Sequence, residues 1–496
     1  MNLIHNRPHA GGDAAEGVAR LDAEAVNSAS QRDLYQKRQQ IYPKLVHGKF
    51  RLAKWVFLVL ALGVYYLLPF VRWDRGPDAP SQAVLIDFPN TRFYFFFIEI
   101  WPQEVYYITG LLILAALVLF LVTALFGRVW CGYACPQTVW TDLFIAVERL
   151  FEGDRNKRIL LDRAPMSFNK AWRKGGKHTV WVLIAAATGG AWILYFHDAF
   201  DLLRDFFTGQ APLTAYVFCA VLTFTTYSLA GLMREQVCTY MCPWPRIQAA
   251  LTDRESLNVT YRTDRGEPRG RHKKGESWDG RGDCIDCKAC VAACPMGIDI
   301  RDGAQLECIG CALCIDACDD IMDKISRPRG LIAYDTDDNI TRRSQGEKPR
   351  FSFIRPRIVL YVVLIAGVSA LMLLGLNTRD ELGLHADRDR NPNFVVLTDG
   401  SVRNTYTINV QNKAYADRAL RLDVAGDPAL QVQVLGVRGE PVLEIGPDRT
   451  RLFQVFLTLP PGAALRHSIP VTFTITDPAT GETAAAESFL VTGAAP

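Results

Sequence analysis

Eight cysteines repeat one spacing twice within a short stretch of the chain. Residues 284–318 read CIDCKACVAACPMGIDIRDGAQLECIGCALCIDAC, and the pattern CxxCxxCxxxC occurs in it two times. Bacterial dicluster ferredoxins have this spacing, because three closely spaced thiolates bind one 4Fe–4S cubane and the fourth binds the other. We therefore predict two clusters with crossed ligand sets: Cys284, Cys287, Cys290 and Cys318 for the first, and Cys308, Cys311, Cys314 and Cys294 for the second.

Zinc and disulfides are the alternatives for so many cysteines. Zinc sites usually combine CxxC pairs or add histidines, and neither arrangement fits a CxxCxxC triplet that occurs twice. Soft thiolates at this spacing suit iron–sulfur clusters best. The second repeat has Asp319 where the first has Pro295, but that proline shapes a turn and supplies no ligand.

Two further motifs carry cysteines four residues apart. CGYACP contains Cys131 and Cys135, and CTYMCP contains Cys238 and Cys242. Each CxxxCP follows a pair of apolar runs, so residues 52–150 and 179–252 resemble two copies of one unit, and parallel repeats bring equivalent positions together. Four thiolates could then hold a metal ion or a cluster. The alternatives are packed thiols or two disulfides, while Cys219, inside an apolar run, is expected to be a packing residue.

Long apolar runs indicate a membrane protein. Of the 496 residues 49% are hydrophobic, and each run is about long enough to cross a hydrocarbon core of roughly 30 Å. The five runs are residues 52–71, 105–126, 179–196, 212–232 and 358–376. The segment 93–101 is too short to span, and we expect it to be interfacial or a lead-in to the second helix.

The distribution of charge predicts the orientation. The net charge of +3 is uninformative, but one loop between the second and third runs is strongly basic, and basic loops stay in the cytoplasm. Five crossings then leave the ferredoxin-like insert in the cytoplasm and everything after residue 377 on the other side. Such basic loops could instead bind nucleic acid. Their position beside the spans favours the interpretation that their charge sets the orientation of the chain in the membrane. The loop contains Arg128, Arg149, Arg155, Lys157, Arg158, Arg163, Lys170, Arg173, Lys174 and Lys177.

These features divide the chain into five predicted parts. The fold class is a membrane α-helical protein with about five transmembrane helices, an inserted dicluster ferredoxin domain and a C-terminal immunoglobulin-like β-sandwich. The sandwich is inferred from short alternating strands separated by turn residues. The parts are a cytoplasmic tail (1–50), a four-helix membrane region (51–252), the ferredoxin domain with linkers (253–350), a fifth transmembrane helix (351–378) and the periplasmic β-sandwich (379–496).

Taken together, these motifs resemble the CcoG family of cytochrome oxidase accessory proteins, also called FixG or RdxA. The resemblance rests on IYPKLVHGKFR, CGYACPQTVWTDLF, CTYMCPWPRIQ and CPMGIDIRDGAQLECIGCALCIDACD. It implies a multi-pass protein of the bacterial inner membrane that reduces Cu(II) to Cu(I) for the copper site of cbb-type oxidase. Copper would bind at Cys131, Cys135, Cys238 and Cys242. The implied partners are a copper chaperone or exporter, oxidase subunits or assembly factors, and a cytoplasmic electron donor that the sequence does not identify.

Two other functions fit the same residues. The chain could be a quinol-linked membrane ferredoxin that passes electrons to a redox partner, with an iron–sulfur centre at the CxxxCP motifs. It could also be a non-enzymatic scaffold for oxidase assembly. No GxGxxG fingerprint indicates an internal nicotinamide or flavin site, and we expect no nucleic acid partner.

Overall fold

The computed structural model describes residues 21–27, 39–76, 79–273, 275–437, 439–461 and 467–493. The chain forms two compact units, Met1–Val71 with Gln82–Met372 and Arg72–Ser81 with Leu373–Pro496, which we describe separately. Of the predicted N-terminal tail, residues 1–20 and 28–38 lie outside the described residues. The described segment 21–27 packs on the ferredoxin-like region, where the backbone N–H of Leu21 donates to the Cys287 carbonyl (3.0 Å) and that of Val26 to the Gly297 carbonyl (2.7 Å).

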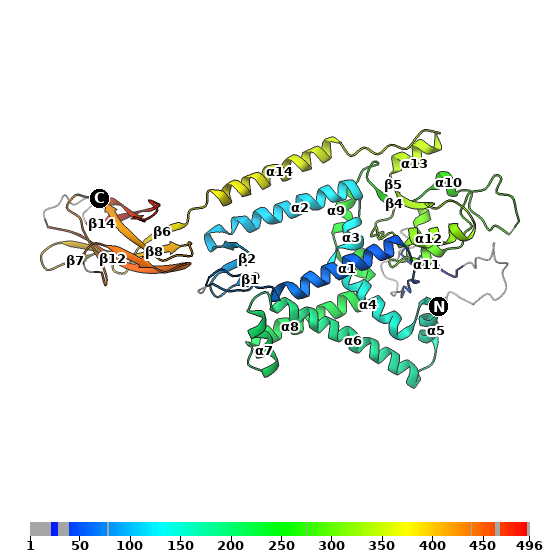
Figure 1. Ribbon diagram of the computed structural model, residues 1–496, viewed down its shortest axis with the longest axis horizontal. Helices are drawn as coiled ribbons and strands as arrows, with labels where there is room; N and C mark the ends of the chain where they lie inside the picture. The colour runs from blue at the N-terminus through cyan, green and yellow to red at the C-terminus, as the bar shows by residue number, and fades with distance from the viewer. Residues whose placement is uncertain are drawn as a thin grey trace. The chain divides into compact units, whose positions relative to one another are not determined.

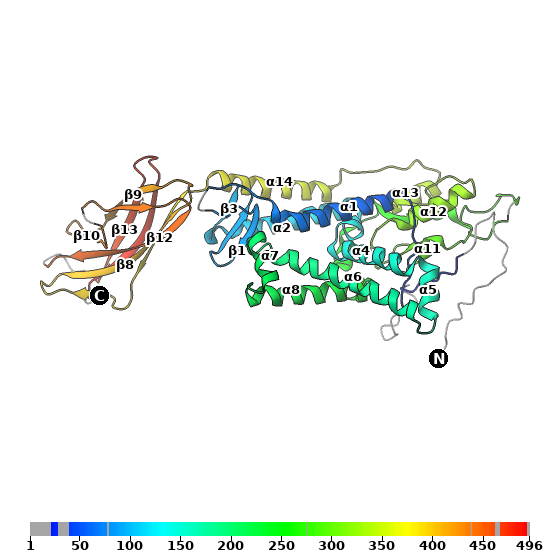
Figure 2. The same cartoon turned by 60° about the horizontal axis from the view of Figure 1, so that its bottom comes forward.

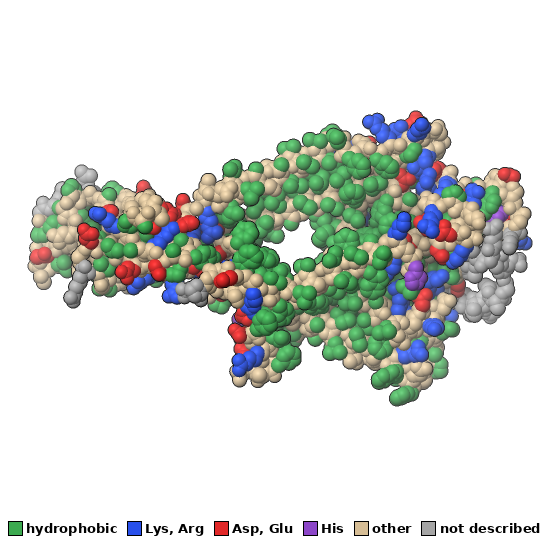
Figure 3. Space-filling model, in the orientation of Figure 1, with side chains coloured by type: hydrophobic (Ala, Val, Ile, Leu, Met, Phe, Trp, Pro, Cys, Tyr) green, Lys and Arg blue, Asp and Glu red, His purple; other side chains and the backbone are tan. Residues whose placement is uncertain are grey.

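The first unit contains long apolar helices that run side by side (Figures 1 and 2). Among the described residues, four helical segments are long and apolar enough to cross a membrane, and each overlaps one predicted run almost completely. Hydrophobic side chains cover the surface over α1, α2 and α14, while charged side chains gather near α12 and α13 (Figure 3). The four segments are Lys49–Phe70 with α1 (Lys49–Leu67), α2 (Tyr106–Phe126), Leu213–Met233 with α8 (Leu213–Thr226), and α14 (Pro356–Asn377).

The remaining predicted run, residues 179–196, lies mainly in α6 (Phe168–Ile193), which is not one of these four. The first half of α6 is polar, because it contains the sequence NKAWRKGGKH. Its second half nevertheless lies against α1 and α8. The Tyr65 hydroxyl donates to the Thr188 carbonyl (2.8 Å), and a Cβ on Gly189 would lie only 2.6 Å from the carbonyl oxygen of Cys219. Cys219 is buried in the apolar cluster beside Ile193 and Leu194, in agreement with a packing role.

A small antiparallel sheet occupies the end of this unit opposite the cysteine-rich region (Figures 1 and 2). Its strands are β1 (Val84–Asp87), β2 (Arg92–Phe95) and β3 (Ile98–Ile100). The helix α7 (Ala199–Thr208) lies at the same end. The prediction for residues 93–101 did not include this hairpin, in which β2 pairs with β3 and Phe93 lies opposite Ile100.

The ferredoxin-like region is built from two similar cysteine loops. Each loop precedes a helix, α11 (Ala289–Ala293) or α12 (Leu313–Lys324), and the residue before each helix, Lys288 or Ala312, has a left-handed backbone with φ of 57° or 59°. The strands β4 (Asn258–Tyr261) and β5 (Ile332–Asp335) pair and close the region, with α10 (Thr263–Gly266) and α13 (Asp337–Ser344) nearby. The repeated sequence spacing thus produces a repeated backbone.

Short helices surround the two CxxxCP motifs. Cys131 lies in α3 (Val129–Tyr133), and Cys135 immediately precedes α4 (Pro136–Glu152), whose first residue is a proline as helix N-termini allow. Cys238 lies in a π-helical turn (Val237–Met241) that follows another (Tyr227–Met233), and α9 (Trp244–Leu251) begins after Cys242. The connecting helix α5 covers Arg155–Arg163.

The second unit contains a two-sheet β-sandwich. One sheet has the order β10-β12-β8-β6 with β7 paired to β8, and the other has the order β11-β9-β13-β14. Alternate residues face the core: Val455, Leu457 and Leu459 from one sheet meet Val471 and Phe473 from the other. The predicted sandwich is confirmed. Its strands are β6 (Leu382–Arg388), β7 (Val395–Val396), β8 (Val402–Asn412), β9 (Arg418–Ala425), β10 (Gln431–Val434), β11 (Val442–Ile445), β12 (Arg449–Leu459), β13 (Ser468–Thr476) and β14 (Thr483–Val491).

Candidate functional site

In the ferredoxin-like region, the fourth cysteine of each repeat lies near thiols of the other repeat. Cys318 is buried, which raises its thiol pKa, and the thiols that add to this rise are those of Cys290, Cys287 and Cys284. Cys294 is half-buried, desolvation raises its thiol pKa to about 12, and its thiol neighbours include Cys311 and Cys308. Each fourth cysteine therefore lies beside the triplet of the other repeat.

The surroundings of these thiols fit iron–sulfur clusters. A cavity at the second set is lined by Cys290, Cys294, Cys308, Cys311 and Cys314 together with apolar side chains such as Ile298 and Ile309. Backbone N–H groups of Ala289 and Gly310 donate to the thiols of Cys287 and Cys308. Hydrogen bonds to sulfur and an apolar shell are the features with which proteins tune such clusters.

The thiols are not arranged for a single metal ion. Among the residues that the structure describes, no three His, Cys, Asp or Glu side chains form a group that could hold one ion. In a cubane each cysteine binds a different iron, so its ligands need not converge on one point.

The structure brings the two CxxxCP motifs together. Burial raises the pKa of the Cys131 thiol to about 12, and the thiols that add to it are Cys135, Cys238 and Cys242. Burial likewise raises the pKa of Cys238 to about 12, with Cys135 and Cys242 as its thiol neighbours. Cys242 is exposed and Cys135 half-buried. A soft metal ion that binds here must displace the thiol protons.

Polar groups that the sequence did not reveal complete this region. The Cys131 thiol donates to Oε1 of Gln248 (3.3 Å), a fully buried side chain 117 residues away. A cavity beside Cys238 is lined by Lys54, Asp142, Glu235 and Met296 among others. Met296, rather than the exposed Met241, is the buried methionine of this region.

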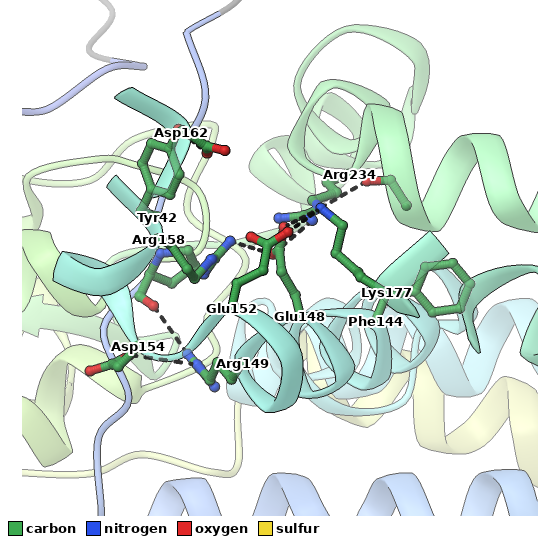
Figure 4. A network of polar contacts seen from close by, with 12 residues as sticks. Tyr42, Phe144, Glu148, Arg149, Glu152, Asp154, Arg158, Asp162, Lys177 and Arg234 are labelled. Atoms are coloured by element: carbon green, nitrogen blue, oxygen red, sulfur yellow. Dashed lines mark hydrogen bonds and ion pairs between the residues drawn. The ribbon is translucent and has the colours of Figure 1, made fainter. Parts of the chain in front are cut away.

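A buried charge network holds the segment that leads to Cys238 (Figure 4). Glu148 on α4 forms ion pairs with Arg158, with Lys177 (3.4 Å) and with Arg234 (2.8 Å). Arg234 has a left-handed backbone with φ of 32° and also donates from Nε to the Gly231 carbonyl (2.9 Å). The network thus fixes the bend between the two π-helical turns. Several arginines and lysines that indicated topology in the sequence therefore also have a structural role.

Three protein-family models match parts of the chain. A 4Fe-4S dicluster domain matches residues 233–337, which include all eight ferredoxin-like cysteines as well as Cys238 and Cys242. A 4Fe-4S binding domain matches residues 108–157, which include Cys131 and Cys135. The IG-like fold at the C-terminal of FixG matches residues 372–492. These matches support iron–sulfur clusters and agree with the observed sandwich.

Three curated proteins are similar over most of their length. The nitrogen fixation protein FixG of Rhizobium meliloti is 50% identical over 90% of this chain and 91% of its own length. Protein RdxA of Cereibacter sphaeroides is 51% identical over 90% of this chain and 93% of its own length. Protein RdxB of the same organism is 50% identical over 86% of this chain and 90% of its own length. With these relatives, and with a C-terminal domain that the FixG family model matches, the chain belongs to the FixG family of iron–sulfur redox proteins.

Proposed function

We propose that this iron–sulfur protein is a cupric reductase that supplies Cu(I) for the copper site of a cbb-type cytochrome c oxidase. The observation that carries the proposal is that four thiols from two distant motifs lie near one another, since Cys135, Cys238 and Cys242 are all electrostatic neighbours of Cys131. Among the described residues these thiols do not converge as a ready-made site for one ion, so copper has to draw them together. Cu(II) prefers nitrogen and oxygen ligands, whereas Cu(I) prefers soft sulfur. A site of four sulfur atoms therefore favours the reduced ion.

The residues of the chain have separate roles in this proposal. Cys284, Cys287, Cys290 and Cys318 would hold one 4Fe–4S cluster, and Cys308, Cys311, Cys314 and Cys294 the other; bound clusters supply one-electron transfer. The four CxxxCP cysteines would bind copper as substrate. Each Cu(II) takes up one electron, and a one-electron donor in the cytoplasm loses one. Cu(I) would then pass to a copper chaperone or exporter.

The proposal includes an orientation in the bacterial inner membrane. The N-terminus and the ferredoxin-like domain would lie in the cytoplasm and the sandwich in the periplasm. The basic residues from Arg128 to Lys177, which lie after α2 and in the first half of α6, support this orientation through the positive-inside rule. The sandwich would then be free to meet oxidase subunits or assembly factors.

The test is anaerobic copper reduction by the purified full-length protein in detergent. We reduce the clusters with dithionite, remove the excess, add Cu(II), and follow cluster bleaching against Cu(I) formation with a chromophoric chelator. The double variant Cys135→Ser, Cys242→Ser should keep the cluster spectrum and lose Cu(I) formation, and Cys219→Ser is the matched control. Equally fast reoxidation in the double variant would mean that Cu(II) takes electrons directly from the clusters, which contradicts the proposal.

A second candidate is a quinol-linked membrane ferredoxin with an iron–sulfur centre of its own at the CxxxCP motifs. The match of a 4Fe-4S binding domain to residues 108–157 favours it, because that segment contains Cys131 and Cys135. Iron analysis separates the two functions: two clusters require about eight irons per chain and three require about twelve. A loss of about four irons in the double variant would favour this candidate over copper.

A further inference from the structure

Arg128 connects both CxxxCP motifs to one of the two cysteine loops. It lies three residues before Cys131, and its Nη1 donates to the carbonyls of Leu306 and Cys308, the latter at 2.8 Å. Its Nη2 donates to the carbonyl of Pro245 (2.8 Å), three residues after Cys242. One guanidinium therefore joins the first motif, the second motif and the loop that begins the second cysteine set.

The backbones of the same two regions are in direct contact. A Cβ on Gly132 would lie 2.8 Å from the Gly310 carbonyl oxygen and 2.9 Å from the Cys311 Cα. The Tyr133 hydroxyl donates to the Cys311 carbonyl (3.3 Å). Only glycine allows this approach at residue 132, because any side chain would push the two loops apart. These contacts, like the bonds from Arg128 to Leu306 and Cys308, all involve residues 306–311 of the second cysteine loop.

The charge of Arg128 acts on both sites. Its half-buried guanidinium interacts favourably with the thiols of Cys308 and Cys131. The first cysteine set has a different arginine: Arg301 interacts with the thiol of Cys290 and forms ion pairs with Asp286 (2.7 Å) and Asp299 (2.6 Å). Each cysteine set therefore has its own neighbouring cation, and only the cation of the second set also contacts both CxxxCP motifs through the bonds described above.

We propose that Arg128 is a positioning residue that couples the CxxxCP site to the second cysteine set, Cys294, Cys308, Cys311 and Cys314. An electron exchanged with the CxxxCP site then oxidises one partner and reduces the other by one electron across the contact of Gly132 with Gly310. The first cysteine set, Cys284, Cys287, Cys290 and Cys318, then receives electrons from the electron donor. The inference rests on the proposed function only in that both cysteine sets hold clusters, and it holds whether the CxxxCP site takes copper or iron.

A charge change at Arg128 should alter one cluster selectively. A nearby positive charge stabilises the reduced and more negative state of a cluster, and this effect falls with distance. Arg128→Gln should therefore shift the reduction potential of the second cluster to a more negative value and leave that of the first unchanged. Arg301→Gln should shift the first cluster only. Arg128→Lys keeps the charge but cannot reproduce the planar fork, so we expect a smaller potential shift.

The experiment is a redox titration of the full-length protein in detergent, monitored by electron paramagnetic resonance. In the expected result Arg128→Gln and Arg301→Gln move different signals. The proposal is overturned if both variants move the same signal, or if Arg128→Gln moves neither while its iron content stays at about eight per chain. These readouts need no copper, so failure of the copper assay would not change them.

A steric variant covers the case in which Arg128→Gln fails to fold. Gly132→Ala leaves the charge in place and separates the loops, whereas Gly175→Ala, a helical position with no atom within 4 Å of the added Cβ, is its matched control. Gly132→Ala should slow the reoxidation of the signal assigned to the second cluster after an acceptor is added, relative to Gly175→Ala. Equal reoxidation rates in the two variants would contradict the coupling.

Discussion

The Gln248 amide can form a hydrogen bond with the Cys131 sulfur whether that sulfur is a thiol or a thiolate. Its Oε1 accepts from the thiol at 3.3 Å, while its Nε2 is buried with no hydrogen-bond partner among the described residues. A half-turn of the amide would offer an N–H donor, which a thiolate or a metal-bound sulfur requires. Such outer partners of a metal site usually contribute about 10-fold to 100-fold in affinity.

On the proposed copper function, Gln248→Leu should therefore weaken Cu(I) binding at the CxxxCP site by about 10-fold or more. The measurement is competition against a chromophoric Cu(I) chelator under anaerobic conditions. Gln345→Leu, at an exposed glutamine beyond α13, is the control with unchanged affinity. Unchanged affinity in Gln248→Leu would mean that Cys131 is not a copper ligand or that water replaces the amide.

The residues of the site divide into those that spacing reveals and those that it does not. The cysteines could be predicted because the ligands of one cluster come mainly from one short loop, whose spacing is set by the geometry of the cubane. Gln248 and Arg128 could not, because their contacts lie 117 and 180 residues away along the chain. Gly132 also gave no signal, since its role depends on the backbone of a distant loop.

At the scale of elements, α4, α5 and α6 are held together by Glu148. Its side chain is fully buried, and burial alone would raise its pKa, but Arg234, Arg158 and Lys177 outweigh burial and lower the pKa to about 2. Glu148→Gln leaves two buried guanidinium groups without their carboxylate. Removing one partner of a buried ion pair typically costs about 3–5 kcal/mol.

We expect this loss in the free energy of unfolding of Glu148→Gln, measured by denaturant titration in detergent and followed by tryptophan fluorescence. Trp181 reports locally, because its ring stacks on Phe144 with centroids 5.3 Å apart. The matched control is Glu347→Gln, whose pair with Arg342 is largely exposed and should contribute at most about 1 kcal/mol. Equal effects of the two variants would rule out a special role of the network.

The pH dependence of this difference follows from the sign of the shift. A carboxylate with a lowered pKa stabilises the folded state above its unfolded pKa of about 4.3, and that stabilisation disappears as pH falls toward the folded value. The difference between wild type and Glu148→Gln should therefore be constant from pH 8 to pH 5. A difference that already declines at pH 6 would show that another group titrates.

Contacts between segments far apart in the sequence restrict how many times the chain can cross the membrane. Residues before α6 and residues after α8 pack together, as the Tyr133 bond to Cys311 and the Arg128 bond to Cys308 demonstrate. They must therefore lie on the same side of the membrane. If α8 crosses, α6 must cross as well, although its polar first half keeps it below the hydropathy of the other spans. Composition alone could not settle this point, because it does not reveal that Lys174 and Lys177 in the polar half of α6 pair with Glu152 and Glu148 on α4.

If α6 crosses as well, the chain has five crossings, and the proposed topology then has the sandwich in the periplasm and the ferredoxin-like region in the cytoplasm. Reporter fusions test this topology. Alkaline phosphatase fused after Pro496 should be active, since it folds only in the periplasm, and a fluorescent protein that folds only in the cytoplasm should be dark at the same position. A matched pair of fusions after Lys348, before α14, should give the reverse pattern. If the C-terminal fluorescent fusion is bright and the phosphatase inactive, the chain lies on the same side of the membrane before and after α14 (Pro356–Asn377), and α14 does not span the bilayer.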